Sequence, residues 1–325
     1  MRVLFRAAAG PAVGFGHLVR CRSIARALGV IPIVSIRGSR ETAGTASMRG
    51  FEVRKGGVAL LRGPSRPDVL VIDDPSAEHA ERWVRCARAA GVPVATLHDV
   101  GLAYVPSDLV IDGSIAPRLD AAALTLAGPT YAALDPSIAT ARSGSSRVRR
   151  GVLIALGGGA AITRWGHALA VAILERRPDT LVRIAAGFTS KPAGDADPRL
   201  SWVLAPYGLA DELRQTEVAV VGGGLTLYEA AALSAPPVAV AVVEAQRPAI
   251  QGFVRRRAAV DGGMLTGAAS LVRVADEVTT LLASSSKARR LGQAGARLVD
   301  GRGVFRVADA IRRLARRAEG RTHAA

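Results

Sequence analysis

The sequence predicts an α/β protein made of two Rossmann-like domains with parallel sheets. Three observations predict it. Short, nearly continuous runs of Val, Ile and Leu alternate with segments of helical apolar spacing, which is typical of parallel strands buried on both faces. This alternation stops once, near the middle of the 325 residues, and then restarts. Glycine-rich turns follow several of the strand-like runs, where open α/β sheets bind their ligands.

The first half of the chain alternates strand and helix from its beginning. Helical spacing is found over residues 17–28 and 77–90. The strand-like runs are residues 2–8, 31–37, 68–74, 92–99 and 108–113. We interpret residues 1–140 as one domain, which we expect to hold the sugar or acceptor.

The stretch "ARSGSSRVRR", residues 141–150, has no apolar period and is predicted to be a linker. After it the alternation resumes, with helical spacing over residues 162–176, 225–234 and 246–258, and strand-like runs over residues 151–159, 180–187, 218–224 and 237–243. We predict a second domain over residues 151–325, including a basic amphipathic helix over residues 306–321. The two domains are expected to face each other across a central cleft that holds the ligand.

Composition narrows the function classes. The formal net charge is +16, carried almost wholly by arginine, and favours anionic partners such as phosphates, although genomic base composition can also enrich arginine. Aromatic residues make up only 4%, so binding of nucleic acid by base stacking is not expected. No apolar run approaches the roughly 20 residues of a membrane span. With two cysteines and no metal-ligand spacing, we expect a cytoplasmic protein without a metal or cofactor.

The glycine motifs exclude two common nucleotide-binding classes. Gly14 and Gly16 are followed by Val19 where the dinucleotide fingerprint needs a third glycine, and Gly222 and Gly224 are followed by Leu227. The chain also contains no phosphate-binding loop with its lysine. A dinucleotide-dependent dehydrogenase and a P-loop phosphotransferase are therefore disfavoured.

A strand, a triple glycine and a helix follow one another in "VAVVGGGLTLYEAAALSA", residues 218–235. The bare turn Gly222, Gly223 and Gly224 lets a ligand approach the backbone, and the helix N-terminus attracts phosphate. Thr226 is expected to contact phosphate or to cap the helix. Glu229 can accept two hydrogen bonds from a ribose diol, so the pattern predicts a nucleoside diphosphate site. The alternative is that Glu229 merely complements the helix dipole.

A similar arrangement occurs earlier, where Gly157 and Gly158 end a strand-like run before the next helical segment. We predict that this second turn also takes part in nucleotide binding. Close packing of a strand on a helix is the alternative explanation for either turn.

The stretch "AVGFGHLVRC", residues 12–21, places Gly14 and Gly16 before a histidine at the start of a helical pattern. The positive end of the helix dipole disfavours an imidazolium, so His17 is expected to be a neutral general base. Arg20, one turn further, is expected to face a phosphate. The alternative for His17 is a histidine that only packs.

Charged residues at other strand ends are weaker candidates. Asp73 and Asp74 end one strand-like run, while His98 and Asp99 end the next. These residues either border the ligand or cap helices. The remaining histidines, His79, His167 and His323, are expected to be surface or packing residues.

Several stretches together resemble the UDP-sugar hydrolases of the pseudaminic acid pathway, whose substrate is UDP-2,4-diacetamido-2,4,6-trideoxy-β-L-altropyranose and which belong to the GT-B glycosyltransferase superfamily. The likeness covers most of residues 1–260. It rests on "RVLFRAAAGPAVGFGHLVRCRSIARAL", "LAGPTYAALDP", "VLIALGGGA", "VAVVGGGLTLYEAAALSAPPVAV" and "VVEAQRP".

This resemblance implies a GT-B-like fold and cleavage of a UDP-sugar to UDP and a free sugar during the biosynthesis of cell-surface or flagellar glycan precursors. It implies that His17 is catalytic, that Glu229 binds the uridine ribose and that the glycine turns hold the pyrophosphate. Gln246 corresponds to a residue near the sugar.

The sequence departs from that family on the sugar side. Ala7, Ala8 and Ala9 replace a stretch that usually contains an aspartate, Asp74 and Pro75 stand where His-Tyr is common, and Ala245 precedes Gln246 in place of asparagine. Pockets that lose such polar groups change their preference strongly. These departures leave open a different sugar or an acceptor other than water.

Two alternatives stay open at this point. A GT-B glycosyltransferase that uses a UDP-sugar donor without a metal would share the same donor site. A non-catalytic scaffold could instead lay the basic helix 306–321 on an anionic membrane, unless that helix packs on its own domain.

Overall fold

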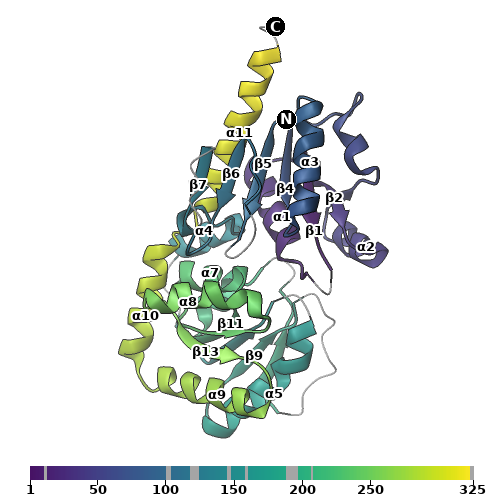
Figure 1. Cartoon of the computed structure of the whole chain (residues 1–325). Helices are drawn as coiled ribbons and strands as arrows, with labels where there is room; N and C mark the ends of the chain where they lie inside the picture. Colours follow the sequence, from purple (N-terminus) through teal and green to yellow (C-terminus); the bar gives the residue numbers. More distant parts are fainter. Residues whose placement is uncertain are drawn as a thin grey trace. The chain divides into compact units, whose positions relative to one another are not determined.

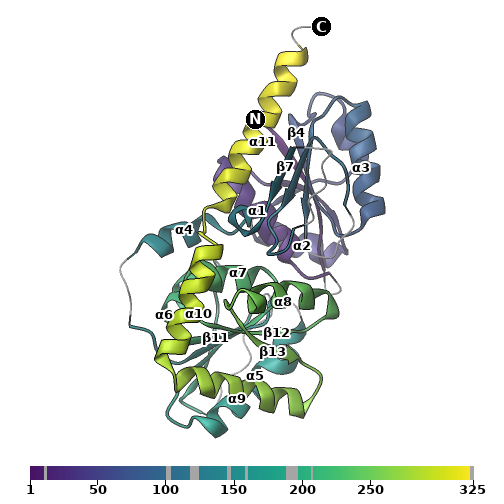
Figure 2. The same cartoon turned by 60° about the vertical axis from the view of Figure 1, so that its left-hand side comes forward.

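The computed structural model describes residues 1–10, 13–99, 104–117, 124–144, 148–157, 160–187, 197–205 and 208–322. The chain forms two compact units (Figures 1 and 2). Unit 1 consists of Met1–Pro136 together with Arg302–Ala325, and unit 2 of Ser137–Gly301. The predicted class, two Rossmann-like parallel α/β domains, is confirmed.

In unit 1, seven strands among the described residues form one parallel sheet in the order β3-β2-β1-β4-β5-β6-β7. Its strands are β1 (Val3–Ala8), β2 (Ile33–Arg37), β3 (Glu52–Val53), β4 (Val69–Asp73), β5 (Val94–His98), β6 (Leu109–Asp112) and β7 (Leu124–Ala127). Its helices are α1 (Gly16–Leu28), α2 (Arg40–Met48), α3 (Ala77–Ala89) and α11 (Gly303–Thr322), with short 3-10 turns η1 (Gly57–Leu61) and η2 (Pro129–Tyr131).

Alternation along each strand divides the core of unit 1 into two layers. Val3, Phe5 and Ala7 of β1 pack with α1 and α11, whereas Leu4 packs in the other layer, with Trp83 of α3. All six residues of β1 are buried, as expected for a strand covered on both faces.

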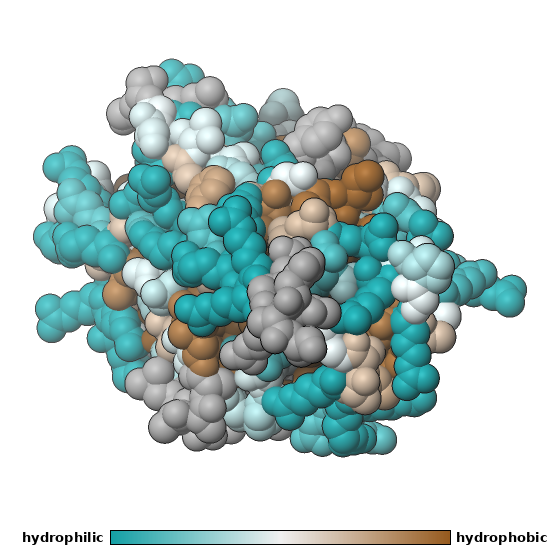
Figure 3. All heavy atoms as spheres, turned by 90° about the horizontal axis from the view of Figure 1, so that it is seen from above, coloured by the Kyte–Doolittle hydropathy of each residue, from teal (hydrophilic) through white to brown (hydrophobic). Residues whose placement is uncertain are grey.

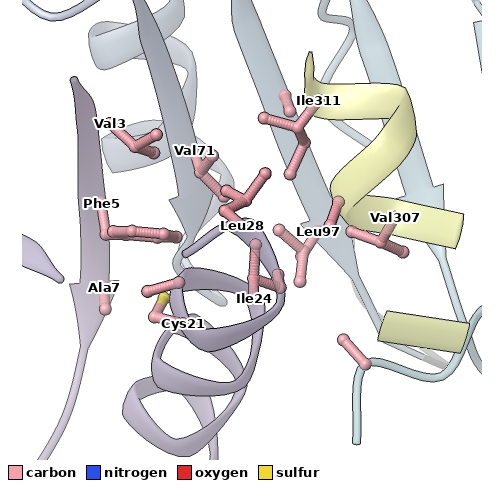
Figure 4. Packing of buried hydrophobic residues seen from close by; sticks show 14 of the residues in the cluster. Val3, Phe5, Ala7, Cys21, Ile24, Leu28, Val71, Leu97, Val307 and Ile311 are labelled. Carbon is pink, nitrogen blue, oxygen red and sulfur yellow. The ribbon is translucent and has the colours of Figure 1, made fainter. Parts of the chain in front are cut away.

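Helix α11 belongs to unit 1, so our assignment of residues 302–325 to the second domain was wrong. Its apolar residues Val307 and Ile311 lie among Leu28 and Leu97 in Figure 4, and both are fully buried. The amphipathic pattern predicted that one face of this helix is buried, but it could not identify the surface that covers it. Because that face packs on its own unit, the helix cannot lay it on a membrane, which weakens the scaffold alternative.

In unit 2, six strands among the described residues form a parallel sheet in the order β10-β9-β8-β11-β12-β13. These are β8 (Val152–Ala155), β9 (Val182–Ala185), β10 (Leu200–Val203), β11 (Val218–Gly222), β12 (Pro237–Ala241) and β13 (Val260–Met264). The helices are α4 (Pro136–Ser143), α5 (Ala160–Arg176), α6 (Ala210–Gln215), α7 (Leu225–Ala232), α8 (Arg247–Arg255), α9 (Ala268–Leu282) and α10 (Ser285–Leu298), with the 3-10 turn η3 (Glu244–Gln246).

The segment predicted as a linker is partly structured. Helix α4 extends to Ser143, and Arg142 donates hydrogen bonds to the carbonyl oxygens of Ala232 (2.6 Å) and Ala296 (2.9 Å). Arg149 likewise donates to the carbonyl oxygen of Leu233 at 2.8 Å. These arginines, which belong to the segment predicted as a linker, anchor the chain to unit 2. The chain passes from unit 1 to unit 2 after Pro136 and returns to unit 1 at Arg302.

The surface in Figure 3 is largely hydrophilic, with apolar side chains in small patches. Among the described residues, no helix combines the length and the apolar character needed to cross a membrane.

Both sheets have a switch point, where the strand order reverses beside the first strand of the unit. In unit 1 the reversal falls between β1 and β4, and in unit 2 between β8 and β11. Open α/β sheets bind ligands at the carboxyl ends of the strands at such points. Among the described residues, the predicted site residues other than Gln246 follow β1, β8 and β11 and therefore lie at these two places, whereas Gln246 follows β12.

Candidate functional site

Gly10 and Gly14, which lie between β1 and α1, pair through their backbones. The backbone N–H of Gly14 donates to the carbonyl oxygen of Gly10 at 2.7 Å, and the N–H of Gly10 donates back to Gly14 at 3.1 Å. Gly14 has φ +82°, a conformation that favours glycine. Helix α1 then begins at Gly16, and no side chain caps it. His17 is thus the second residue of the helix, and its side chain does not cap the helix.

The ring of His17 contacts a buried carboxylate. Its Nδ1 lies 2.7 Å from Oδ1 of Asp73, the last residue of β4, whose side chain is 1% exposed. Arg20 Nη2 also lies 3.2 Å from the same nitrogen, but it is a donor. Because a lone pair on Nδ1 would face the carboxylate at short range, we assign the proton to Nδ1. A neutral ring then carries its lone pair on Nε2.

Arg20 links Asp73 to a second carboxylate. Its Nε donates to Asp73 Oδ2 at 2.7 Å and its Nη2 to Oδ1 at 2.5 Å, a two-point contact. Its Nη1 donates to Oδ1 of Asp99, which follows β5, at 2.5 Å. We call the four side chains His17, Arg20, Asp73 and Asp99 the histidine cluster.

The electrostatics of the histidine cluster keep Asp73 and Arg20 charged. Burial by itself would raise the pKa of Asp73, but the charges and hydrogen bonds of Arg20 and His17 hold that pKa well below its usual range. Burial would lower the pKa of Arg20, and the two carboxylates raise it well above the ordinary value instead. Next to them, burial followed by the charge of Asp73 raises the pKa of the Cys21 thiol.

The surroundings of Arg20 differ from those we predicted. We expected its charge to face a phosphate, whereas the structure surrounds its guanidinium with two carboxylates. A phosphate contact from Arg20 stays a prediction, and this pairing disfavours it. Sequence reasoning treated Asp73 and Asp99 as weak candidates. Their positions at the ends of β4 and β5 were the signal that could have joined them to His17.

The other strand-end residues have packing partners. Asp74 is bound by Arg37, with Nη2–Oδ1 and Nε–Oδ2 distances of 2.6 and 2.9 Å, and it accepts the backbone N–H of Ser76 at 3.0 Å. The ring of His98 stacks on Tyr104 with a centroid separation of 5.4 Å. These contacts fix the edge of the sheet around the histidine cluster.

Unit 2 presents glycines and backbone at its switch point. Gly157 follows β8 with φ +95°, and a Cβ built on it would meet no atom of the described residues within 4 Å. Gly158 lies outside the described residues. At the end of β11, a Cβ on Gly223 would approach the carbonyl oxygen of Gln246 to 2.8 Å, whereas one on Gly224 would meet nothing within 4 Å. Close packing therefore explains Gly223, while open space lies beside Gly157 and Gly224.

Helix α7 starts directly after the glycine turn. Its N-cap residue is Gly224, and no side chain caps it, so the alternative in which Thr226 is a cap is wrong. Thr226 is the second residue of the helix. Glu229 is the fifth, is 8% exposed and lies beyond the first turn, where the helix dipole has little effect. The dipole explanation of Glu229 is therefore weakened.

Gln246 lies beside the same glycine turn. Its Oε1 accepts the backbone N–H of Val242 at 3.0 Å, and its Nε2 would lie 3.7 Å from a Cβ built on Gly222. The side chain thus helps to shape the loop after β12 and borders the glycine turn. A place for Gln246 near the sugar, which the resemblance implied, stays a prediction.

Within the described part of the chain, no group of three or more His, Cys, Asp or Glu side chains could hold a metal ion.

Comparison with known proteins supports the fold. No protein-family profile matches the chain. The chain is similar to the spore coat polysaccharide biosynthesis protein SpsG of Bacillus subtilis (strain 168), at 28% identity over 194 residues, or 55% of this chain. That match spans only 56% of the SpsG sequence.

Solved structures match over nearly the whole chain. The glycosyltransferase VinC in complex with DTDP covers 98% of this chain and 100% of its own, with a TM-score of 0.62 and 16% identity. The UDP-GlcNAc 2-epimerase from Neisseria meningitidis bound to UDP-GlcNAc covers 96% and 100%, with a TM-score of 0.61 and 10% identity. The chain therefore has the GT-B fold, which these proteins use for different reactions.

Proposed function

We propose that this protein is an enzyme that cleaves a nucleoside-diphosphate sugar, with His17 as the general base. The observation that carries the proposal is the hydrogen bond of 2.7 Å between His17 Nδ1 and the buried Asp73. A histidine held by a carboxylate through one nitrogen, with the other nitrogen basic, is the usual arrangement of an acid–base catalyst.

The charge of the histidine cluster supports this role. Asp73 and Asp99 contribute two negative charges and Arg20 one positive charge, so the cluster carries one net negative charge while His17 is neutral. Uptake of a proton by His17 makes the cluster neutral. Proton transfer from a bound hydroxyl to Nε2 is thus electrostatically favourable in a buried setting.

The bond changes follow from this assignment. His17 Nε2 takes the proton of an attacking O–H group. The oxygen of that group forms a bond to the anomeric carbon of the sugar, while the bond from this carbon to the diphosphate oxygen breaks. The electron pair leaves with the diphosphate. In our proposal, the glycine turns of unit 2 and the N-terminus of α7 stabilise this charge.

The nucleotide assignment to unit 2 rests on Gly157, Gly224, Thr226 and Glu229. Open space beside the glycines permits a diphosphate to approach the backbone, and Glu229 follows at one further turn of the helix. VinC in complex with DTDP and the epimerase bound to UDP-GlcNAc show that proteins of this fold take nucleoside diphosphates and their sugars. The resemblance at the sequence level favours UDP.

The acceptor is either water or a hydroxyl group of a second substrate. The stretch around His17 resembles the UDP-sugar hydrolases, which favours water. VinC is a glycosyltransferase of the same fold, and the name of SpsG refers to polysaccharide biosynthesis; both favour transfer to a glycan precursor at least as well. His17 would activate the attacking oxygen in either reaction.

The test is product analysis with a panel of UDP- and dTDP-sugars, each incubated alone and with candidate sugar acceptors. Release of free sugar without an acceptor indicates a hydrolase, and an acceptor-dependent product indicates a transferase. If no nucleotide sugar in a broad panel is consumed and calorimetry detects no binding of UDP or dTDP, the proposed function is wrong.

A further inference from the structure

The histidine cluster contains more charge than a histidine–aspartate pair needs. Asp73 alone could orient His17, yet Arg20 is almost fully buried beside it and extends to Asp99. Burying a guanidinium is costly unless it is paired and hydrogen-bonded. We therefore expect a function that depends on the positive charge of Arg20 and on the orientation of its guanidinium between Asp73 and Asp99.

We infer that Arg20 and Asp99 form a positioning pair that fixes Asp73 and adjusts how strongly His17 binds a proton. Arg20 competes with His17 for Oδ1 of Asp73, since its Nη2 lies 2.5 Å from that oxygen and His17 Nδ1 lies 2.7 Å from it. Its positive charge disfavours a protonated His17. Asp99 partly offsets that charge from the other side of the guanidinium.

This inference rests on the proposed role of His17 and deepens it. Without Arg20, Asp73 would hold a protonated imidazole tightly, and His17 would be a weak base at neutral pH because it would already carry the proton. Without Asp99, the positive field would be stronger, and a neutral His17 would accept a proton less readily. Arg20 and Asp99 thus act in opposite directions on the binding of a proton by His17.

Cys21 is a further ionisable group beside the histidine cluster. Asp73 comes from β4, Arg20 and Cys21 come from α1, and Asp99 follows β5. Cys21 is fully buried, and because burial raises its pKa it stays an uncharged thiol. Arg20 and Asp99 are therefore the groups whose removal changes the charge around the His17–Asp73 pair.

The experiment is an NMR titration of His17 in the full-length protein without substrate, comparing the wild type with Arg20→Met and Asp99→Asn. We expect opposite shifts of the His17 titration midpoint. Arg20→Met should raise it by about one pH unit, and Asp99→Asn should lower it by about half a unit. In the active enzyme, the acidic limb of the kcat/KM profile should move in the same directions.

Arg26→Lys is the matched control. Arg26 lies on the same helix and binds Asp135 at 2.6 Å, so this variant alters an ion pair between α1 and the rest of unit 1 without changing the histidine cluster. The His17 midpoint should stay unchanged in it. Asp99→Asn keeps the test decisive if Arg20→Met does not fold, because the side chain of Asp99 is 42% exposed.

Unchanged midpoints in the folded variants, or shifts of the same sign, would overturn the inference. A large loss of affinity for inorganic pyrophosphate in Arg20→Met, with no change in the midpoint, would also overturn it in favour of a phosphate contact. The titration needs no turnover, so failure to find a substrate would count against the proposed function without deciding this point.

Discussion

The two units share a topology but differ in the chemistry at their switch points. In unit 1, the ends of β4 and β5 and the start of α1 bring charged side chains together, and Asp73 is almost fully buried among them. In unit 2, the ends of β8 and β11 present glycines, and the helix that follows has no acidic residue in its first turn.

In the function that we propose, this difference divides the reaction into two tasks. A histidine held by charged partners suits proton transfer, because the partners influence how strongly it binds a proton. Bare backbone at a helix N-terminus suits an anionic leaving group, because its N–H groups point at the ligand and do not titrate. We therefore expect changes in unit 1 to affect turnover and changes in unit 2 to affect nucleotide affinity.

His17→Ala tests the first half of this comparison and should have the largest effect. Removal of a general base typically lowers turnover by about 10²–10⁴-fold. Binding of UDP, measured by calorimetry, should stay within about threefold, a difference below 1 kcal/mol. The matched control is His79→Ala, which removes an exposed histidine of α3 that contacts Ser76. Normal turnover in His17→Ala would contradict the catalytic assignment.

Ile311→Ala tests a second difference, since unit 1 is completed by the end of the chain whereas unit 2 is continuous. Ile311 is 0% exposed, and its removal should lower the free energy of unfolding by about 2–5 kcal/mol. Hydrogen exchange should increase in unit 1 and not in unit 2. Arg313→Ala, an exposed position on the same helix, is the control. Unchanged protection of unit 1 in Ile311→Ala would contradict this packing.

The sequence predicted the fold well because its signals are local. The apolar runs 2–8 and 218–224 contain β1 and β11, and the helical spacing over 17–28 matches α1. Short elements such as β3 were not predicted, because two residues of a strand carry no period. The position of α11 could not be predicted either, since an apolar stripe does not identify the sheet that covers it.

The candidate site was predicted only in part, for a similar reason. The glycine turns and His17 can be recognised from a few neighbouring residues, because each lies between a strand-like run and a helical pattern. The pairing of His17 with Asp73 spans 56 positions and that of Arg20 with Asp99 spans 79, so both depend on the strand order β1-β4-β5. The strand order is a property of the folded sheet, and it cannot be predicted from the residues around His17 or from those at the strand ends.

Gly224→Ala tests whether the glycine turn of unit 2 binds the diphosphate. Its φ of −95° suits alanine and no atom lies within 4 Å of the added Cβ, so the protein should fold normally. The methyl group would occupy space that we assign to the diphosphate, and UDP affinity should fall about tenfold, or 1.4 kcal/mol. Gly267→Ala is the matched control, because Gly267 is also a helix N-cap with open space beside it. Unchanged UDP affinity in Gly224→Ala would place the diphosphate elsewhere.

Glu229→Gln should have the smallest effect and the most specific one. A carboxylate that accepts two hydrogen bonds from a ribose diol loses part of that interaction as an amide, so UDP affinity should fall about three- to tenfold. Binding of 2′-deoxy-UDP, which lacks one hydroxyl group, should fall less. Glu217→Gln changes a carboxylate in the same unit that accepts the N–H of Gly151 at 2.7 Å and serves as the control. Equal losses for both nucleotides would show that Glu229 supports the helix and does not contact the ribose.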